Sequence, residues 1–571
     1  MERDEFREAS EIHAMTLPST IRPIVGQSLI TRVTRLYNGT LTDGLHELLQ
    51  NARRAGATRV DISINLADGK AQLLVGDDGC GIDDPAVLVT LGQSGWGDGT
   101  ASREDPAGMG LFSLAGKRVT VHAWSPAAAQ GWQVTIPDDG WEGARPLSIE
   151  PSDIAAGTCI HIDLPSACRD RLHTAVAAAA LHFPLPVSFR GAEQRRQDFL
   201  DGALWFENGP GYRIGVFCGT GHQPQNAPRI NFHGVTVPCY HAEVAESDGR
   251  KVWTARVDLH DAPALQLVLP ARKEVVQNAA LTALQLVMET AIYKAIAAQP
   301  NHRLPFKRWR RALELGVALP EARVGLDAWG PIRADNDGVF DIGQVTSGPM
   351  VIIPELEADL AQAAAPVLGH AGLMGAAPVS QEPAFEGYGW YDAVPRVTQV
   401  DVTFDCAVGS CSYGTSSVGL LPDTISSGKV PDLLLDLTIA TSRQPDADTC
   451  VRTFDLDMMV IGDACSWLDD AVILVREGAT VSPAMLADLI EASLYCPSDD
   501  ADSDSWQTQN DDFCRQARSA ANALLLGDEE ALLARLREAI HDHVAWLIPS
   551  DRKLIVSAQK GDVSVTVALA D

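Results

Sequence analysis

Positive charge is scarce in this sequence, and the shortage restricts the partners that the protein can have. The 571 residues include 45 lysines and arginines against 75 aspartates and glutamates, so the formal net charge at pH 7 is −30. A protein that mainly binds a DNA backbone usually presents a basic surface. We therefore do not expect nucleic acid to be the main partner. The basic segment 307–311 fits either a local basic patch or the solvated start of a helix.

Long apolar runs, a secretion signal and paired CxxC motifs are also lacking. We find no apolar stretch of the length that crosses a bilayer, and the charged residues 1–5 do not resemble the start of a signal peptide. We therefore expect a cytoplasmic protein without a membrane partner. The eleven cysteines are scattered, which argues against a zinc site and favours reduced thiols.

The chain is too long for a single core and predicts several domains. Leucines and alanines at helical spacing predict a helix over 43–55. Alternating or apolar runs predict strands at 59–64, 71–75, 119–124 and 158–164. Helices mixed with antiparallel strands predict an α+β fold, with a first domain over 1–165.

Two further regions follow this first domain. Residues 166–300 form a predicted middle domain with strands at 213–217, 230–237, 252–259 and 265–269 and a helix over 275–298. Residues 301–496 predict a C-terminal α/β region with strands at 350–353, 400–404, 433–439 and 471–475 and helices over 356–368 and 482–495. Residues 506–571 predict a helical pair, 508–526 and 528–547, and a β-hairpin, 553–558 with 563–569.

The predicted helix over 43–55 carries a carboxylate and a carboxamide one turn apart, Glu47 and Asn51. Residues four apart lie on one helix face. An amide oxygen can ligate a hard cation such as Mg²⁺, and a carboxylate can take a proton from a water that attacks a phosphate. This spacing is common on exposed helices, so by itself it does not indicate a site. It indicates one only together with the other motifs of the chain.

Three glycine-containing motifs come later in the chain. Asp77-Asp78-Gly79-Cys80-Gly81-Ile82 follows a predicted strand, where an aspartate could accept a hydrogen bond from an exocyclic amine and the glycines would let a flat ring approach. Gly108-Met109-Gly110-Leu111 leads into a predicted helix, whose free N–H groups would attract phosphate. Gly157-Thr158 opens the strand 158–164.

In this order, the four motifs resemble those of the GHKL superfamily of ATPases, which includes gyrase, histidine kinases, a heat-shock chaperone and MutL-type ATPases. The segment Ala55-Gly56-Ala57 after the asparagine is similar to the chaperone and MutL branches. The chain departs from these branches at Arg54, where they usually have an aspartate. No helical hairpin with a phosphoacceptor histidine precedes Glu47, which sets the chain apart from sensor kinases.

The resemblance implies an α/β sandwich that binds ATP and Mg²⁺ beneath a lid at about 92–107. It implies that Glu47 is the general base, Asn51 the Mg²⁺ ligand and Asp77 the acceptor for the adenine amine. The residues that it places around the nucleotide are Asn51, Ala55, Asp77, Gly79, Gly81, Ile82, Ser94, Gly108, Met109, Gly110, Leu111, Phe112 and Thr158.

The resemblance extends less specifically into the middle domain. In the chaperone and MutL branches, that domain contains a left-handed βαβ crossover and directs a basic residue to the γ-phosphate. Here Arg272 or Lys273, between a predicted strand and the long helix, would be that residue. A charged pair at a surface helix start is the alternative interpretation.

The leading functional hypothesis is an ATP-driven conformational machine of chaperone or MutL type. It would hydrolyse ATP, associate as a homodimer through its N-terminal domain and act on an unidentified protein partner or client. A scaffold that senses ATP without useful turnover is an alternative from another class, and a phosphotransferase is a third. Glu47 favours turnover, because a pure sensor needs no base.

Overall fold

The computed structural model describes residues 40–67, 70–90, 96, 110–142, 145–165, 168–222, 224, 226–240, 243–268, 273–335, 343–369, 375–406, 409–416, 425–462, 467–500 and 503–569. The chain divides into two compact units. The first comprises Met1–His302 with Arg311–Leu319, and the second comprises Arg303–Arg310 with Pro320–Asp571. Several sheets and interspersed helices make the fold a mixed α/β one, consistent with the predicted α+β class.

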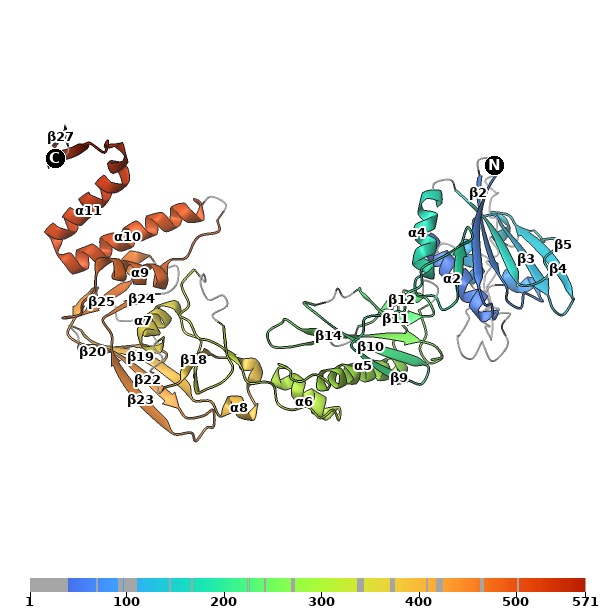
Figure 1. The fold of residues 1–571 in the computed structure, drawn as a ribbon, viewed down its shortest axis with the longest axis horizontal. Coiled ribbons are helices and arrows are strands. Elements are labelled where there is room, and N and C mark those ends of the chain that lie inside the picture. Colours follow the sequence, from blue (N-terminus) through green and yellow to red (C-terminus); the bar gives the residue numbers. More distant parts are fainter. Residues whose placement is uncertain are drawn as a thin grey trace, which may run out of the picture. The chain divides into compact units, whose positions relative to one another are not determined.

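An eight-stranded sheet forms the first part of unit 1, in the order β5-β4-β3-β6-β2-β1-β7-β8. Its strands are β1 (Val60–Ala67), β2 (Lys70–Asp77), β3 (Val119–Ser125), β4 (Gln130–Ile136), β5 (Ile149–Pro151), β6 (Thr158–Leu164), β7 (Val187–Phe189) and β8 (Ala192–Glu193). Figure 1 shows the helices α2 (Leu41–Arg54) and α4 (Arg169–Ala180) on one face of this sheet. The predicted helix and four predicted strands are confirmed, whereas β4, β5, β7, β8 and α4 were not predicted.

The apolar face of α2 explains its place on the sheet. Leu45, Leu48 and Leu49 are 1%, 4% and 1% exposed and belong to one core with sheet residues such as Ile62 and Leu73. The sheet also continues past residue 165, because β7 pairs in parallel with β1 through Val60 and Val187. Short 3-10 turns at Pro85–Leu88, Gly110–Leu114 (η2) and Gly140–Glu142 complete this part.

A six-stranded sheet forms the rest of unit 1, in the order β12-β11-β14-β10-β9 with β13 beside β14. Its strands are β9 (Trp205–Gly209), β10 (Tyr212–Gly219), β11 (Pro228–Phe232), β12 (Val235–Pro238), β13 (Val244–Ala245) and β14 (Val252–Leu259). The prediction of a single strand over 230–237 is wrong. His233 and Gly234, with φ of 51° and 104°, form a tight turn that folds it into the hairpin β11–β12.

Two other predictions for this part need correction. Within the strand predicted at 265–269, the described residues 265–268 form only an isolated bridge, between Leu267 and Val275, and Leu269 lies outside the described residues. The predicted βαβ crossover is absent from the described elements, because the parallel strands β11 and β14 are joined through β12 and β13 rather than through a helix. The long helix α5 (Ala279–Ala297) follows β14, and no described strand succeeds it in this sheet.

Helix α5 also corrects the expectation that no segment could cross a bilayer. By length and composition alone, Ala279–Ala297 qualifies as a candidate membrane span. Its side chains Leu284, Met288 and Ile292 are buried, and the helix packs against β14 and β10. A core helix that covers a sheet can have the same length and composition, so these two properties alone are weak evidence for a membrane span.

Unit 2 contains a second six-stranded sheet, in the order β18-β17-β19-β22-β23 with β20 beside β19, and a three-stranded sheet β21-β25-β24. The main strands are β17 (Met350–Ile353), β18 (Ala377–Ser380), β19 (Arg396–Cys406), β20 (Gly409–Gly414), β21 (Gly428–Val430), β22 (Leu433–Ala440), β23 (Thr449–Asp455), β24 (Met458–Ile461) and β25 (Val472–Arg476). The short strands β15 (Leu326–Asp327) and β16 (Gln344–Val345) pair separately.

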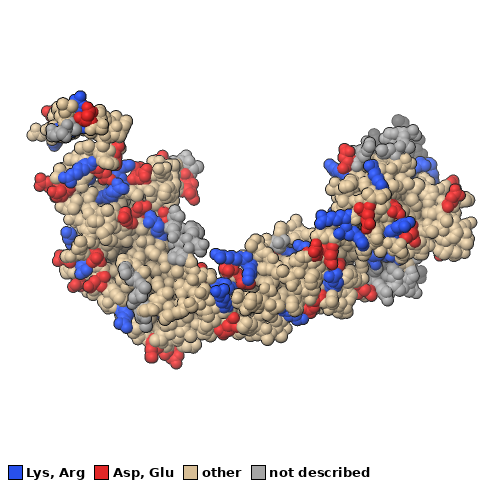
Figure 2. Space-filling model, in the orientation of Figure 1, with Lys and Arg blue, Asp and Glu red and all other residues tan. Residues whose placement is uncertain are grey.

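The helices of the C-terminal half are α6 (Phe306–Glu314), α7 (Ala358–Leu368), α8 (Gly389–Asp392), α9 (Pro483–Leu494), α10 (Trp506–Leu526) and α11 (Asp528–His543), with 3-10 turns at Pro383–Phe385, Leu468–Asp470 and Ala545–Leu547. The hairpin β26 (Arg552–Gln559) with β27 (Asp562–Leu569) follows α11. The strands and helices predicted for this half are confirmed to within a few residues. Acidic and basic side chains are intermixed on the face seen in Figure 2.

Among the described residues, cysteine usage departs from the predicted reduced thiols at Cys496. Eight described cysteines are free thiols: Cys80, Cys159, Cys168, Cys218, Cys239, Cys411, Cys450 and Cys514. Cys496, in contrast, is disulfide-bonded.

Candidate functional site

Helix α2 is fixed at its start by a reciprocal cap. The Thr40 backbone N–H donates to Asp43 Oδ2 at 2.7 Å, and the Asp43 N–H donates to Thr40 Oγ1 at 3.2 Å. With its leucines buried in the core, the helix directs Asp43, Glu47 and Asn51, which are four residues apart, along another face. Both Glu47 and Asn51 are half-buried, and Glu47 Oε2 is shielded from solvent.

Asp77 ends β2 beside the start of β6, where Thr158 is its Cα partner. The Gly79 N–H donates to Asp77 Oδ1 at 2.9 Å. Burial raises the pKa of the Asp77 carboxyl above its usual range, and the backbone hydrogen bonds from Gly79 and Thr158 partly oppose this rise. Thr158 is itself buried, at 7% exposed. The site therefore holds a carboxylate in a poorly solvated position next to a hydroxyl.

The glycines of the Asp77–Ile82 segment are required by contacts within the protein. A Cβ on Gly79 would lie 2.7 Å from Ala55 Cβ, where Cys80 N–H donates to the Ala55 carbonyl at 2.9 Å. Gly81 has a φ of +78° and packs against the Trp124 carbonyl. These contacts give the glycines a structural role within the protein and place the segment directly on the end of α2, while their role in the approach of a ligand stays a prediction.

The Gly157-Thr158 motif, at the start of β6, packs against Asp77. Gly157 has a φ of +69°, and a Cβ there would collide with the Asp77 carbonyl. The Ile82 N–H donates to the Trp124 carbonyl at 2.8 Å, and Trp132 Nε1 donates to the Ile82 carbonyl at 3.0 Å. The Asp77 and Thr158 motifs are therefore held together with the C-terminal end of α2.

The phosphate-binding helix start predicted after Gly108 takes a different form. Gly110–Leu114 is a 3-10 segment of five residues, not an α-helix, so its dipole is smaller than that of the predicted helix. The side chains of Leu111 and Phe112 are buried in the core. The segment packs against α2. Gly108, Met109 and Ser94 lie outside the described residues, as does the predicted lid apart from Trp96.

Arg54, the departure noted in the sequence, contacts the predicted metal ligand. Its Nη1 donates to Asn51 Oδ1 at 3.4 Å within α2. A metal ion at that oxygen would therefore compete with a guanidinium. Next to Glu47, burial lowers the pKa of His46 and favours the neutral imidazole.

The Lys273 side chain, from the segment before α5, lies beside the first turn of α2. Its Nζ is 3.7 Å from Asp43 Oδ2, and the two side chains are 64% and 35% exposed. Asp43 is one turn before Glu47, so the structure brings Lys273 to the helix face that carries the predicted base. Arg272 lies outside the described residues.

Gln50 is a residue of this site that sequence reasoning missed. It is 4% exposed, and its Nε2 donates to the His233 carbonyl at 2.6 Å and to the Phe232 carbonyl at 3.3 Å. It thus joins α2 to the β11–β12 turn of the middle sheet. A glutamine among the buried leucines of the helix was the available signal, but its partners are far away in the sequence.

Comparison with known proteins gives only distant likenesses. No protein-family model matches the chain, and no curated protein matches it. The ATPase region of Saccharomyces cerevisiae topoisomerase II bound to ICRF-187 (dexrazoxane) has a TM-score of 0.30 and 9% identity over 42% of this chain and 78% of that one. Another structure of that region has a TM-score of 0.30 and 8% identity over 43% of this chain and 77% of that one.

Proposed function

We propose that the first part of unit 1 binds ATP and that the chain hydrolyses it. The observation that carries the proposal is the Asp77 carboxylate, which is held in a poorly solvated position where β2, β6 and the end of α2 meet. Its Oδ1 accepts from the Gly79 N–H and the carboxylate also accepts from the Thr158 N–H, but a carboxylate has about four acceptor positions, so it retains capacity for an exocyclic amine such as that of adenine. Thr158, beside it, would complete the contact with the base.

The remaining roles follow the face of α2. Glu47 would take a proton from the water that attacks the γ-phosphate. Backbone N–H groups of the segment from Gly108 to Leu111 would bind the phosphates. Lys273 would stabilise the charge that develops on the transferred phosphoryl group, because a cation is most effective where charge grows in the transition state. Its present ion pair is exposed and weak, so little free energy opposes such a move.

Asn51 supplies the oxygen chemistry that suits Mg²⁺. Within the described residues, no group of three or more His, Cys, Asp or Glu side chains is placed to hold a metal ion. Magnesium is often bound by one or two protein oxygens together with substrate phosphates, so the Asn51 amide fits such a site once Arg54 is displaced. When bound there, the ion would neutralise phosphate charge.

Nucleotide binding would be coupled to the rest of the unit through α2. Gln50 and Asp43 of this helix contact the β11–β12 turn and Lys273, respectively. On this basis we propose a conformational machine of chaperone or MutL type that associates as a homodimer through its N-terminal domain. A protein client would be its partner, and a cytoplasmic location would suit this role.

The test is steady-state phosphate release from ATP by the purified chain and by Glu47→Ala, with nucleotide affinity measured by calorimetry. We expect the variant to bind ATP normally and to turn it over about 10²–10⁴-fold more slowly. Binding without any turnover in the wild type would identify an ATP-sensing scaffold instead. Transfer of label from γ-labelled ATP to protein would identify a phosphotransferase.

A further inference from the structure

A pocket in unit 2 lies at the carboxyl ends of two parallel strands. Strands β17 and β18 pair in parallel, with α7 between them in the chain. Pro354 and Glu355 directly follow β17, and Gln381 directly follows β18. The carboxyl ends of parallel strands are the usual place for ligands in sheets of this kind. The pocket has a volume of about 240 Å³.

The walls of the pocket are fixed by hydrogen bonds. The Trp329 N–H donates to the Pro378 carbonyl at 3.0 Å, which ties the segment that contains Trp329 and Ile332 to β18. Gln362 Nε2 of α7 donates to the Ile332 carbonyl at 2.9 Å. The Gln381 N–H donates to the Ile353 carbonyl at 3.1 Å and joins the two strand ends. The pocket is therefore a built feature of this unit.

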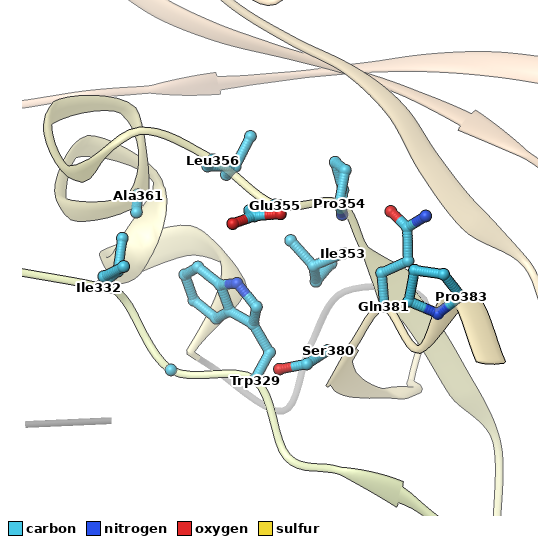
Figure 3. Close-up of a pocket in the computed structure, with 11 residues that line it drawn as sticks. Trp329, Ile332, Ile353, Pro354, Glu355, Leu356, Ala361, Ser380, Gln381 and Pro383 are labelled. Carbon is cyan, nitrogen blue, oxygen red and sulfur yellow. The ribbon is translucent and has the colours of Figure 1, made fainter. Parts of the chain in front are cut away.

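The lining combines apolar side chains, one indole and one carboxylate. Figure 3 shows Trp329, Glu355 and Ser380 directed into the space between α7 and the ends of β17 and β18. Pro354, Leu356 and Ala361 complete the apolar part of the wall. Glu355 is exposed at the pocket, while Trp329 and Ser380 are half-buried.

The charge of the lining selects against anions. Its eleven residues, all within the described part of the chain, include Glu355 and no lysine, arginine or histidine. The start of α7, which could otherwise attract a phosphate, has Glu357 as its N-cap residue. There the Leu360 N–H already donates to the helix's own Asp359 at 2.6 Å. A phosphate ligand is therefore disfavoured here.

We propose that this pocket binds a small organic amine, a compact apolar group that carries one ammonium. The ammonium would pair with the Glu355 carboxylate and lie against the Trp329 ring, because the face of an indole attracts cations. The apolar body would contact Pro354, Leu356 and Ile332. This site lies wholly within unit 2 and does not depend on nucleotide binding in unit 1.

The proposal is tested with three probes of the same size that differ in charge: benzylamine, benzyl alcohol and benzoate. Ligand-observed NMR titrations of the full chain give the three dissociation constants. We expect benzylamine to bind about tenfold more tightly than benzyl alcohol, and benzoate to bind more weakly than either. Equal affinities for the three probes, or no saturation transfer to any of them, would overturn the proposal.

Two variants of lining residues and one control variant locate the interaction. Glu355→Gln should reduce the affinity for benzylamine to that for benzyl alcohol and leave the alcohol unchanged. Glu357→Gln is the matched control, because Glu357 is an exposed carboxylate two residues away that does not line the pocket. Trp329→Leu should weaken both probes, and thermal unfolding shows whether it remains folded. Equal loss of benzylamine binding in the two glutamine variants, or in neither, contradicts the site.

Discussion

Replacing Asp77 by asparagine changes the chemistry of the proposed adenine contact while keeping the size of the side chain. Asp77 Oδ1 accepts from the Gly79 N–H at 2.9 Å, and an asparagine carbonyl can keep that bond. The variant would then present its NH₂ group where the carboxylate presented an acceptor. A donor would face the adenine amine, which is also a donor.

The expected loss follows from the burial of this position. A hydrogen bond to a charged group contributes about 1.5–3 kcal/mol, and leaving buried donors unpaired adds to that cost. A loss of about 2 kcal/mol weakens binding about 30-fold. Calorimetric titration with ATP should therefore show at least this loss in Asp77→Asn.

The stability of the same variant should change in the opposite direction. Burial raises the pKa of Asp77 in the folded state, so the folded protein holds this proton to a higher pH than the unfolded chain does. The contribution of Asp77 to the free energy of unfolding of the wild type therefore increases as pH falls through the folded pKa and is lost above it. Asp77→Asn should unfold at the same or a higher temperature near pH 7, and this advantage should shrink at acid pH.

Asp78→Asn is the matched control, with the same chemical change one residue later. Asp78 is exposed and accepts from Thr58 N–H at 2.7 Å and from the Thr58 hydroxyl, which lowers its pKa to about 2. Its stabilising contribution is present above the unfolded pKa and is lost as pH falls from about 4 to about 2. This variant should keep ATP binding and lose stability at neutral pH. Wild-type affinity in Asp77→Asn, or equal losses in both variants, would refute the adenine assignment.

Three further predictions concern the rest of α2 and its contacts. Lys273→Ala should leave the unfolding temperature nearly unchanged, because its ion pair is exposed, but should lower turnover at least about tenfold; unchanged turnover would remove Lys273 from the mechanism. Arg54→Ala should lower the Mg²⁺ concentration for half-maximal turnover by freeing the Asn51 amide oxygen, whereas Arg53→Ala should not; the same Mg²⁺ dependence in both would contradict this competition. Gln50→Leu should cost about 1–3 kcal/mol in chemical denaturation, because two carbonyls lose a buried donor, and an unchanged midpoint would show that these bonds are unimportant.

The parts of the fold that the sequence predicted well have a local cause. Helix α2 has four buried apolar residues at helical spacing and a cap at Thr40. The strands β6 and β14 have the predicted bounds, because apolar and polar residues alternate along the second half of each strand. Helix α4 was missed although its run of alanines favours a helix.

Other elements depend on contacts distant in the sequence. Strand β4 contains Gly131, a residue type depleted in strands, yet it pairs along its whole length with β3. The β11–β12 turn was hidden because His233 and Gly234 stand between two apolar runs that together look like one strand. Pairing partners decide these elements, and a single sequence does not display them.

Some contacts of the candidate site were likewise predictable from the sequence, and others were not. The proximity of Arg54 to Asn51 was predictable, since residues three apart share a helix face. The contacts of Gln50 with the middle sheet and of Lys273 with Asp43 each join residues more than 180 positions apart. Only the folded chain reveals them.

Hydrogen–deuterium exchange with a non-hydrolysable ATP analogue and Mg²⁺ tests the central claim most directly. The account predicts that saturating analogue slows exchange in α2, in residues 77–82, in Gly110–Leu114 and at the start of β6, while peptides of Pro320–Asp571 are unchanged. It also predicts that Asp77→Asn abolishes this protection at the same nucleotide concentration, whereas Asp78→Asn retains it. Protection confined to the second unit, or none at saturating nucleotide, would contradict an ATP site in the first unit.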